Sequence, residues 1–367
     1  MLNIDEKQLN LTYAKASKKF ILAEDDSGFI IRGFAIKSRD ADLIIPQSID
    51  GKQVHTIGSN AFCDDGYKFY DVFIPGSIRS IEEDAFHGCS INNTLVISEG
   101  VVSIGSRAFG ETNLTTIKLP DSLESIGSAA FEKNNNLKKF TLPKNVSSIE
   151  GGLFGFCFNL KSISVDKENK YFDARGGCNA IIETATDKLV CGCLGTKIPK
   201  GVKSLGEFCF FNIPLSSIDI PEGVQSIEGG ALSCDSDDEY LRKHAYQLTS
   251  IALPSTLTRI GRDAFSDQKK LKKIEIPSGV SVIENGAFSD TGLQTLIIPE
   301  GVTTLGDYAF SGCEKLKKVS IPASVTNFGN SLFPYRALIE KGAIFEVKSD
   351  SEALRFARKK KLSYVEK

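Results

Sequence analysis

Histidines, serines beside glycines and clustered carboxylates are the residues of this chain whose types could do chemistry. The three histidines, His55, His87 and His244, stand far apart, and none belongs to the spaced pair of a metalloprotease. The Gly-Ser pairs at 105–106 and 127–128 do not form the G-x-S-x-G of a nucleophile elbow. Adjacent carboxylates such as those at 82–83 do not face one another on a helix. We therefore expect no catalytic, cofactor-binding or metal-binding residues, and no enzyme.

Nine cysteines in 367 residues are too few for a disulfide scaffold. Three of them share one position, three residues after a recurring Phe: Cys89, Cys157 and Cys313. We expect these to be small buried hydrophobic side chains. Three others lie between positions 166 and 198: Cys178, Cys191 and Cys193. We favour buried thiols there over a cross-hairpin disulfide, and a metal site would lack a fourth ligand because no histidine lies nearby.

A repeat must position all of these residues. The stretch Ile57-Gly58-Ser59-Asn60-Ala61-Phe62 returns in near-copies almost to the C-terminus. The last residue of each copy stands mostly 22 to 24 positions from the next: Phe62, Phe86, Phe109, Phe131, Phe154, Phe210, Leu232, Phe265, Phe288, Phe310 and Phe333. Such a period is typical of a solenoid, whose core grows in one dimension. We expect about eleven coils.

Each copy contains two extended segments and a turn. Apolar and polar residues alternate in Leu-x-x-Ile-x-Ile-Pro, as at 271–277, which predicts a strand that ends at the proline. Val-x-x-Ile then predicts a short extended segment on the opposite side. The glycine after it is replaced by Glu at 82, 150, 228 and 284, so this position does not require positive φ. The Ala-Phe pair is expected on a short helical turn, with its N-terminus favouring a carboxylate and the phenylalanine rings stacked inside.

The unit I-P-x-x-V-x-x-I-G-x-x-A-F-x-x-C-x-x-L resembles that of the BspA-like leucine-rich-repeat family, over roughly residues 42–365. The resemblance implies a right-handed leucine-rich-repeat solenoid of mainly short β-strands and short helical turns. It also implies a bacterial protein that is secreted or displayed on the cell surface, that acts as an adhesin, and that is not an enzyme. Leu232 in place of Phe, and Cys209 and Leu153 in place of Ala, depart from the unit but stay apolar.

Five segments are expected along the chain: 1–41, a lead-in and an N-terminal capping hairpin; 42–165, the first block of repeats; 166–198, a hairpin insert; 199–338, the second block, with a loop insertion at 233–247; and 339–367, a C-terminal cap with a helix. The N-terminal hairpin is predicted from the apolar runs 20–23 and 29–31, and the insert from 180–183 and 189–191. Ser351 is the expected N-cap of the C-terminal helix.

Stacking of the coils should align the polar residues of the repeated strand in two columns. One contains Thr115, Lys138, Lys161, Ser216, Thr249, Lys272, Gln294 and Lys317, and the other Thr116, Lys139, Ser162, Ser217, Ser250, Lys273, Thr295 and Lys318. We predict ligand binding by the lysines of these columns together with three residues of the loop insertion: Lys138, Lys139, Lys161, Lys272, Lys273, Lys317, Lys318, Asp237, Asp238 and Tyr240. The alternative is that these lysines keep a sheet soluble and that the loop is a tolerated insertion.

The charge balance of 44 Lys and Arg against 46 Asp and Glu gives a net charge of −2, so no global field favours nucleic acid or anionic membrane. No apolar run approaches the roughly 18 residues of a transmembrane segment, and the first residues do not read as a signal peptide. We expect a monomeric, non-enzymatic extracellular binding module without cofactors, whose partner is a protein or glycan on another cell or matrix. A structural spacer or self-associating scaffold is the alternative, and an enzyme is less favoured.

Overall fold

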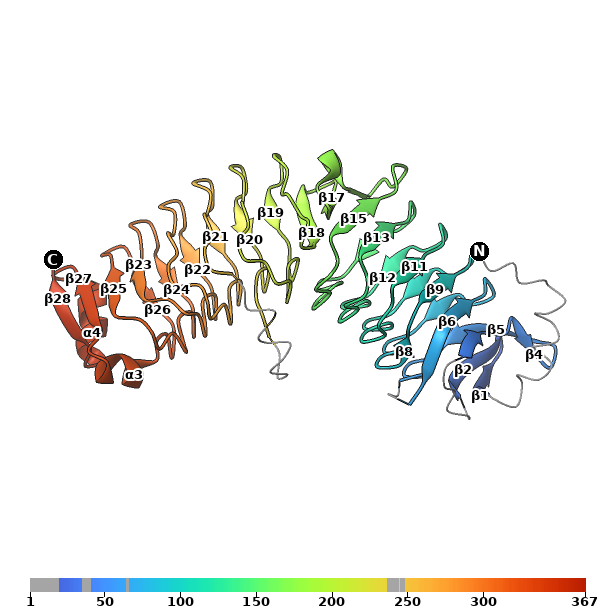
Figure 1. The fold of residues 1–367 in the computed structure, drawn as a ribbon. Coiled ribbons are helices and arrows are strands. Elements are labelled where there is room, and N and C mark those ends of the chain that lie inside the picture. Colours follow the sequence, from blue (N-terminus) through green and yellow to red (C-terminus); the bar gives the residue numbers. More distant parts are fainter. Residues whose placement is uncertain (1–19, 35–40, 64–65, 236–243, 245–247) are drawn as a thin grey trace. The chain divides into compact units, whose positions relative to one another are not determined.

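The computed structural model describes residues 20–34, 41–63, 66–235, 244 and 248–367 (Figure 1). The chain divides into two compact units, Met1–Asp173 and Ala174–Lys367, and this boundary lies inside the predicted 166–198 insert. Both units consist of stacked coils made mostly of short strands, with about 14 turns in all. The predicted β-solenoid is therefore confirmed, although eleven coils were too few. The count rises because the segments at both ends and the hairpin insert also form turns of the stack.

The first unit begins with a hairpin that continues into a ladder of short parallel strands. β1 (Phe20–Asp25) and β2 (Gly28–Phe34) are antiparallel, which confirms the predicted N-terminal hairpin, and β2 runs parallel to β5 (Lys52–Ile57). Four two-residue strands extend the ladder: β7 (Ser80–Ile81), β10 (Ser103–Ile104), β12 (Ser125–Ile126) and β14 (Ser148–Ile149). β4 (Ser48–Ile49) pairs with β5. This ladder is formed by the Val-x-x-Ile segments.

Longer strands form the other side of the first unit. One sheet has the order β11-β9-β6-β3, with β8 also on β6: β3 (Ala41–Ile44), β6 (Lys68–Ile74), β8 (Ser90–Ile91), β9 (Thr94–Ile97) and β11 (Thr116–Lys118). β13 (Lys139–Leu142) pairs in parallel with β15 (Ser162–Val165), and β16 (Phe172–Asp173) ends the unit. Alternating burial along β13 places Phe140 and Leu142 in the core and Lys139 and Thr141 in solvent.

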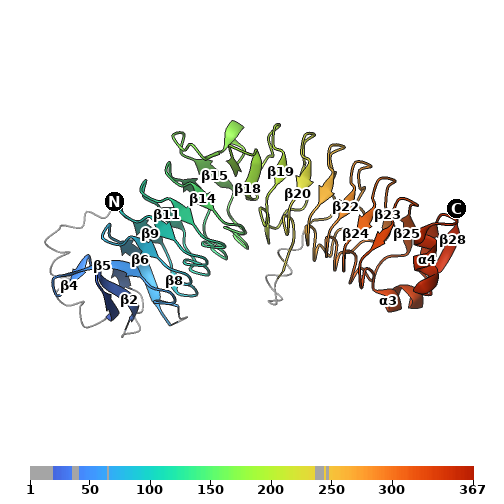
Figure 2. The same ribbon diagram turned by 180° about the vertical axis from the view of Figure 1, so that it is seen from behind.

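The second unit begins with the 3-10 helix η1 (Arg175–Gly177) and the predicted insert hairpin, in which β17 (Ala180–Glu183) is antiparallel to β18 (Lys188–Gly192). A parallel ladder then follows from β18 (Figure 2): β19 (Ser204–Leu205), β20 (Ser226–Ile227), β21 (Arg259–Ile260), β22 (Val282–Ile283), β24 (Thr304–Leu305) and β26 (Asn327–Phe328). The hairpin thus contributes one strand to the stack instead of interrupting it.

On the other side of the second unit only the last coils form a regular sheet. It has the order β23-β25-β27-β28: β23 (Thr295–Ile297), β25 (Lys318–Ile321), β27 (Ile344–Val347) and β28 (Ser363–Glu366). The prediction of a strand at 271–277 is wrong, because 271–277 has no regular strand pairing, and 216–220 and 249–253 share only the isolated bridge between Asp219 and Ala252. Ile274 and Ile276 are nevertheless buried and Lys273 is exposed, so the alternation holds without the ladder.

The Ala-Phe segment of each coil is a series of turns. The amide of Ala85 donates to the carbonyl of Glu82 and that of His87 to Asp84, three residues back as in a helical turn. The residue before the alanine, however, has positive φ, for example 56° at Asp84 and 52° at Arg107. Since L-residues adopt this region only singly, no helix extends from the turn. The glycine positions at 105 and 127 do not have positive φ, as predicted.

The predicted phenylalanine stack is present in both units. Ring centroids of successive residues lie 4.7 to 6.2 Å apart in the first unit: Phe62, Phe86, Phe109, Phe131 and Phe154. They lie 5.1 to 5.5 Å apart in the second: Phe265, Phe288, Phe310 and Phe333. Each ring is at most 2% exposed, and burial of a side chain of this size stabilises by roughly 1.5 to 3 kcal/mol.

Three of the four glutamates that replace glycine, at 82, 150 and 284, bind the backbone of the preceding coil. The carboxylate of Glu82 accepts hydrogen bonds from the amide and hydroxyl of Ser59, at 2.8 and 3.0 Å, and that of Glu150 accepts one from the amide of Ser128 at 2.9 Å. A carboxylate was predicted to stabilise the turn of its own coil. The carboxylates of Glu82 and Glu150 instead satisfy an amide one coil away, so these side chains link neighbouring coils.

The C-terminal part of the chain contains two α-helices, α3 (Tyr335–Glu340) and α4 (Glu352–Lys359). The hydroxyl of Ser351 accepts a hydrogen bond from the amide of Leu354 at 3.1 Å, which confirms the predicted N-cap of α4. Arg358 and Lys359 lie in its last turn, where basic residues are favoured. Among the described residues, no helix combines the length and apolar character that crossing a membrane requires.

Candidate functional site

The two predicted columns of polar residues are in register within each unit. In the first unit the amide of Lys161 donates to the carbonyl of Lys138 at 3.2 Å, and Lys139 pairs with Ser162 across β13 and β15. In the second unit the amide of Lys317 donates to Gln294 at 2.9 Å. The repeat therefore brings the lysines of neighbouring coils side by side, with about 4.8 Å between strands. We call the surface that carries these columns the lysine face.

The seven lysines of the lysine face are exposed, but two of them are paired with carboxylates. Lys273 Nζ lies 2.6 Å from Glu275 Oε1, and Lys318 Nζ lies 2.8 Å from Glu346 Oε1. Hydrogen bonds from these lysines hold the pKa of each carboxyl group below its usual range. The two columns predicted from the sequence therefore overstate the positive charge of the second unit. The acidic partners, Glu275 and Glu346, lie outside these columns, in a third column of the repeated segments.

The first unit carries the stronger positive charge on this face. Within the part of the chain that the structure describes, Lys138, Lys139 and Lys161 take part in no ion pair. Successive lysines one coil apart lie well within the Debye length of about 8 Å at physiological salt. Their potentials therefore add, and an acidic group that approaches the face interacts with all three.

Two grooves lie on the lysine face of the second unit, between coils that lack regular strand pairing. One, of about 310 Å³, is lined by Lys272, Ile251 and Leu253 among others, and the next, of about 270 Å³, by Lys273, Ile276 and Ile297. Ile297 is 57% exposed. These grooves offer apolar contacts beside lysine side chains, a combination that the sequence did not predict. Asp237, Asp238 and Tyr240 lie outside the described residues.

The cysteines of the insert are buried. Each sulfur donates a hydrogen bond to a backbone carbonyl: Cys178 to Ala180, Cys191 to Gly192 and Cys193 to Asn179. Burial raises the pKa of the Cys193 thiol, so the thiolate that a metal requires is disfavoured there. The interpretation of these residues as buried thiols is the one that the geometry supports.

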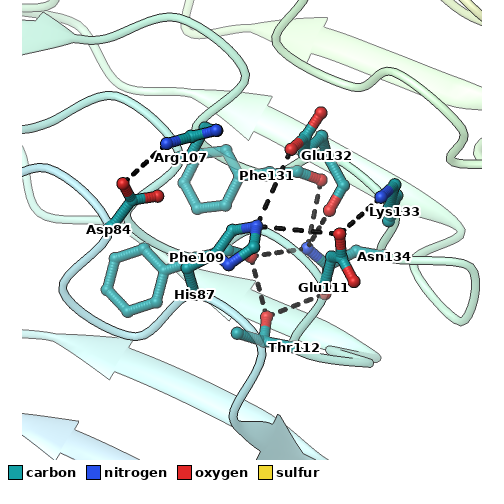
Figure 3. Close-up of polar contacts among 10 residues, drawn as sticks. All are labelled: Asp84, His87, Arg107, Phe109, Glu111, Thr112, Phe131, Glu132, Lys133 and Asn134. Carbon is teal, nitrogen blue, oxygen red and sulfur yellow. Dashed lines mark hydrogen bonds and ion pairs between the residues drawn. The ribbon is translucent and has the colours of Figure 1, made fainter. Parts of the chain in front are cut away.

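A second polar site was missed in the sequence. His87, Glu111 and Glu132 come from three successive coils of the first unit, and their ligand atoms all lie within 4.8 Å of one another (Figure 3). His87 Nε2 is 3.7 Å from Glu111 Oε1 and 3.9 Å from Glu132 Oε1. Burial raises the pKa of Glu132. The repeat register could have revealed this cluster, since the three residues are the first or second after Phe86, Phe109 and Phe131.

Comparisons with known proteins agree with the repeat architecture. Among solved structures, the pneumococcal vaccine antigen PcpA is 21% identical, covers 95% of this chain and 99% of its own, and has a TM-score of 0.62. A leucine-rich-repeat protein from Eubacterium ventriosum is 20% identical over 86% of this chain and 83% of its own, with a TM-score of 0.51. No curated protein matches the chain significantly.

The family itself is shown by a sequence model described as "BspA type Leucine rich repeat region (6 copies)". It matches residues 55–176, 191–239 and 237–349, well over half of the chain. The matched ranges include the repeat units that carry the stacked phenylalanines of both units. The chain belongs to the BspA-type leucine-rich-repeat family.

Proposed function

We propose that this chain is a non-enzymatic binding module that a bacterium secretes or displays on its surface, and that it recognises an acidic protein or glycan on another cell or matrix. The observation that carries the proposal is the row of Lys138, Lys139 and Lys161, exposed and in register on neighbouring coils without carboxylate partners among the described residues. If these lysines served only to keep the sheet soluble, lysines paired with carboxylates would serve equally well, so unpaired lysines favour a role in binding.

The second unit supports the same function with different contacts. Lys272 and Lys317 are exposed there, and the two grooves place Ile251 and Ile297 beside lysines. Binding surfaces generally combine apolar contacts, which supply affinity, with charges that guide approach and orientation. Display outside the cell is proposed from the family, and the related fold named as a pneumococcal vaccine antigen is consistent with it.

Charge reversal tests the lysine face. The triple variant K138E/K139E/K161E is compared with R79E. Arg79 is exposed and precedes β7, on the opposite ladder of the same unit, so R79E reverses a charge away from the lysine face. We would first screen the unaltered protein against matrix proteins and sulfated glycans, and then measure association rates by surface plasmon resonance at two salt concentrations. Loss of guiding charges should slow association at least about tenfold at low salt, and less at high salt.

Equal association rates for the triple variant and the unaltered protein would refute the role of these lysines. R79E should bind as the unaltered protein does, and a loss there would indicate a non-specific charge effect. K272E/K317E separates the two units, because it changes only the second. Light scattering distinguishes the alternative function: association of the protein with itself that increases with concentration would favour a self-associating scaffold.

A further inference from the structure

The turns that follow Phe86, Phe109 and Phe131 bring three potential metal ligands together in the first unit (Figure 3). His87 and Glu132 occupy the same position in their coils, the first after the phenylalanine, and Gly110 occupies it in the coil between them. Glu111 follows Gly110 with φ of 58°. The two outer side chains therefore approach each other across a coil that has no side chain at this position.

Gly110 is the residue that makes this approach possible. A Cβ atom at position 110 would lie 2.9 Å from Cδ2 of His87 and 3.2 Å from Cγ of Glu132, closer than ordinary van der Waals contact. Its φ is not positive, and the nearest backbone atom, the carbonyl oxygen of Arg107 at 3.3 Å, is less close than the two side chains. The glycine is required by the space that the two side chains occupy, which makes the cluster a built feature of the turns.

Backbone hydrogen bonds hold the turns that carry the three side chains in register. The amide of Gly88 donates to the carbonyl of Gly110 at 3.0 Å, that of Glu111 to Glu132 at 2.9 Å, and that of Lys133 to Gly155 at 2.7 Å. These bonds join each coil to the next at the positions that carry the ligands. A metal would therefore meet side chains that start from a rigid frame, and little ordering would be needed to bind it.

The charges around the cluster leave it net negative. Glu111 and Glu132 contribute two carboxylates, and Lys133 pairs with Glu111. Arg107, which also lies nearby, is held by Asp84 with its Nη2 2.7 Å from Oδ2. The Glu132 side chain is only 15% exposed, and in the described part of the chain its carboxylate accepts no hydrogen bond. Its one ion-pair contact there is His87 at 3.9 Å, and Lys133 and Arg107 act on it without touching it. A largely buried carboxylate with so weak a partner gains from a cation.

We infer that His87 Nε2 and one carboxylate oxygen each from Glu111 and Glu132 bind a divalent transition-metal ion of the Zn²⁺ class. One imidazole nitrogen with two carboxylate oxygens is a ligand set that such ions accept, and three protein ligands leave a position for water. With bonds of about 2.1 Å and tetrahedral angles, ligand atoms stand about 3.4 Å apart. The His87 separations of 3.7 and 3.9 Å need to close by only a few tenths of an ångström, and the two carboxylates, which lie within 4.8 Å of each other, by up to about 1.4 Å through side-chain rotation.

Cobalt and zinc titrations test this site on the full, untagged chain. Co²⁺ binding is followed by its visible spectrum and Zn²⁺ by competition against bound Co²⁺. The variants are H87A, E132Q and G110A, with H55A as the matched histidine control, because His55 lies elsewhere with its Nε2 3.0 Å from Asp25. A band from thiolate-to-cobalt charge transfer would reveal metal on cysteine instead. Thermal unfolding monitored by circular dichroism shows whether each variant folds.

The expected result is one Co²⁺ per chain without a thiolate band, and affinity lowered at least about tenfold in H87A, E132Q and G110A but unchanged in H55A. G110A keeps every ligand, so its loss of affinity would identify the space that the glycine leaves. K133M should bind more tightly, since it removes the cation that competes for Glu111. The inference is overturned if the unaltered protein binds neither metal, or if H87A, E132Q and G110A bind as well as H55A.

Discussion

Replacing Asn134 by alanine should destabilise the first unit, because its side chain is the centre of a buried hydrogen-bond network. Asn134 is fully buried. Its Nδ2 donates to the carbonyls of Phe109 at 2.8 Å and Phe131 at 3.0 Å, and its Oδ1 lies 2.9 Å from the hydroxyl of Thr112 (Figure 3). The same Oδ1 accepts from the amide of Leu114 at 2.8 Å. The side chain thus joins two neighbouring coils beneath the surface turns.

The magnitude follows from counting which groups keep a partner when the amide is removed. Without Asn134, the single hydroxyl proton of Thr112 goes to the carbonyl of Phe109, 2.8 Å away, and the carbonyl of Phe131 retains the thiol of Cys157 at 3.2 Å. The amide of Leu114, by contrast, loses its only recorded partner in the described structure. An orphaned buried N–H costs about 1 to 3 kcal/mol, and the lost bonds add about 1 kcal/mol, so Asn134→Ala should cost about 2 to 4 kcal/mol.

Cysteine at position 134 provides the matched comparison. Cys157 and Cys313 occupy the equivalent position of other coils, and each sulfur donates to the carbonyl of the phenylalanine one coil back. Asn134→Cys should restore that bond to Phe109 but not the acceptor for Leu114, and it should therefore lose less stability than Asn134→Ala.

Urea unfolding gives the free energies of unfolding, and hydrogen exchange of the Leu114 amide reports the local effect. Because stability in a repeat array is a sum over neighbouring coils, both measurements are needed. The reasoning is refuted if Asn134→Ala loses less than about 1 kcal/mol while the Leu114 amide remains as protected as in the unaltered protein.

Three further changes test other parts of the fold. Phe288→Ala removes one ring of the second stack and should cost about 3 to 5 kcal/mol in urea unfolding, whereas a value under about 1 kcal/mol would contradict a packed core there. Hydrogen bonds from the backbone and side chain of Ser255 lower the pKa of Glu222, so the stability it contributes should be present above the usual Glu pKa and lost as the pH falls through the lowered value. Glu222→Gln should flatten that part of the stability profile, and an unchanged acid limb would be evidence against it. Burial raises the pKa of Cys157 to about 12 and that of Cys313 to about 11, so both should resist iodoacetamide in the folded protein and react after denaturation, as peptide mass spectrometry can show.

The sequence predicted those parts of the structure that depend on the stacking of equivalent positions. The phenylalanine stack, the short ladders and the in-register lysines follow from the period alone, because each coil places a given position above the same position of the coil before it. Ser351 and the two hairpins were predicted from local signals of capping and turn residues, which need no tertiary information.

Features that depend on unlike positions were missed. Glu346 meets Lys318 from the next coil, and the carboxylate of Glu82 reaches the backbone of the coil before it, although neither pair shares a column. The loss of strand pairing at 271–277 is another case, since its apolar alternation is that of a strand. Whether a ladder forms there depends on the spacing of the neighbouring coils, and the pattern within one segment contains no information on that spacing.

The cluster of His87 with two glutamates shows where variation can accumulate without disturbing the fold. At the first and second positions after Phe86 and Phe109, the backbone amides of His87, Gly110 and Glu111 are satisfied by backbone carbonyls of the same or the next coil. The side chains of His87 and Glu111 make no hydrogen bond to the backbone in the described structure. At the third position, by contrast, Thr112 and Asn134 bind buried carbonyls. Where the backbone hydrogen bonds are complete without the side chain, a substitution that points to solvent should change the free energy of unfolding little. In this solenoid we therefore expect metal-binding and other polar side chains at such positions of the turns, one residue away from the core.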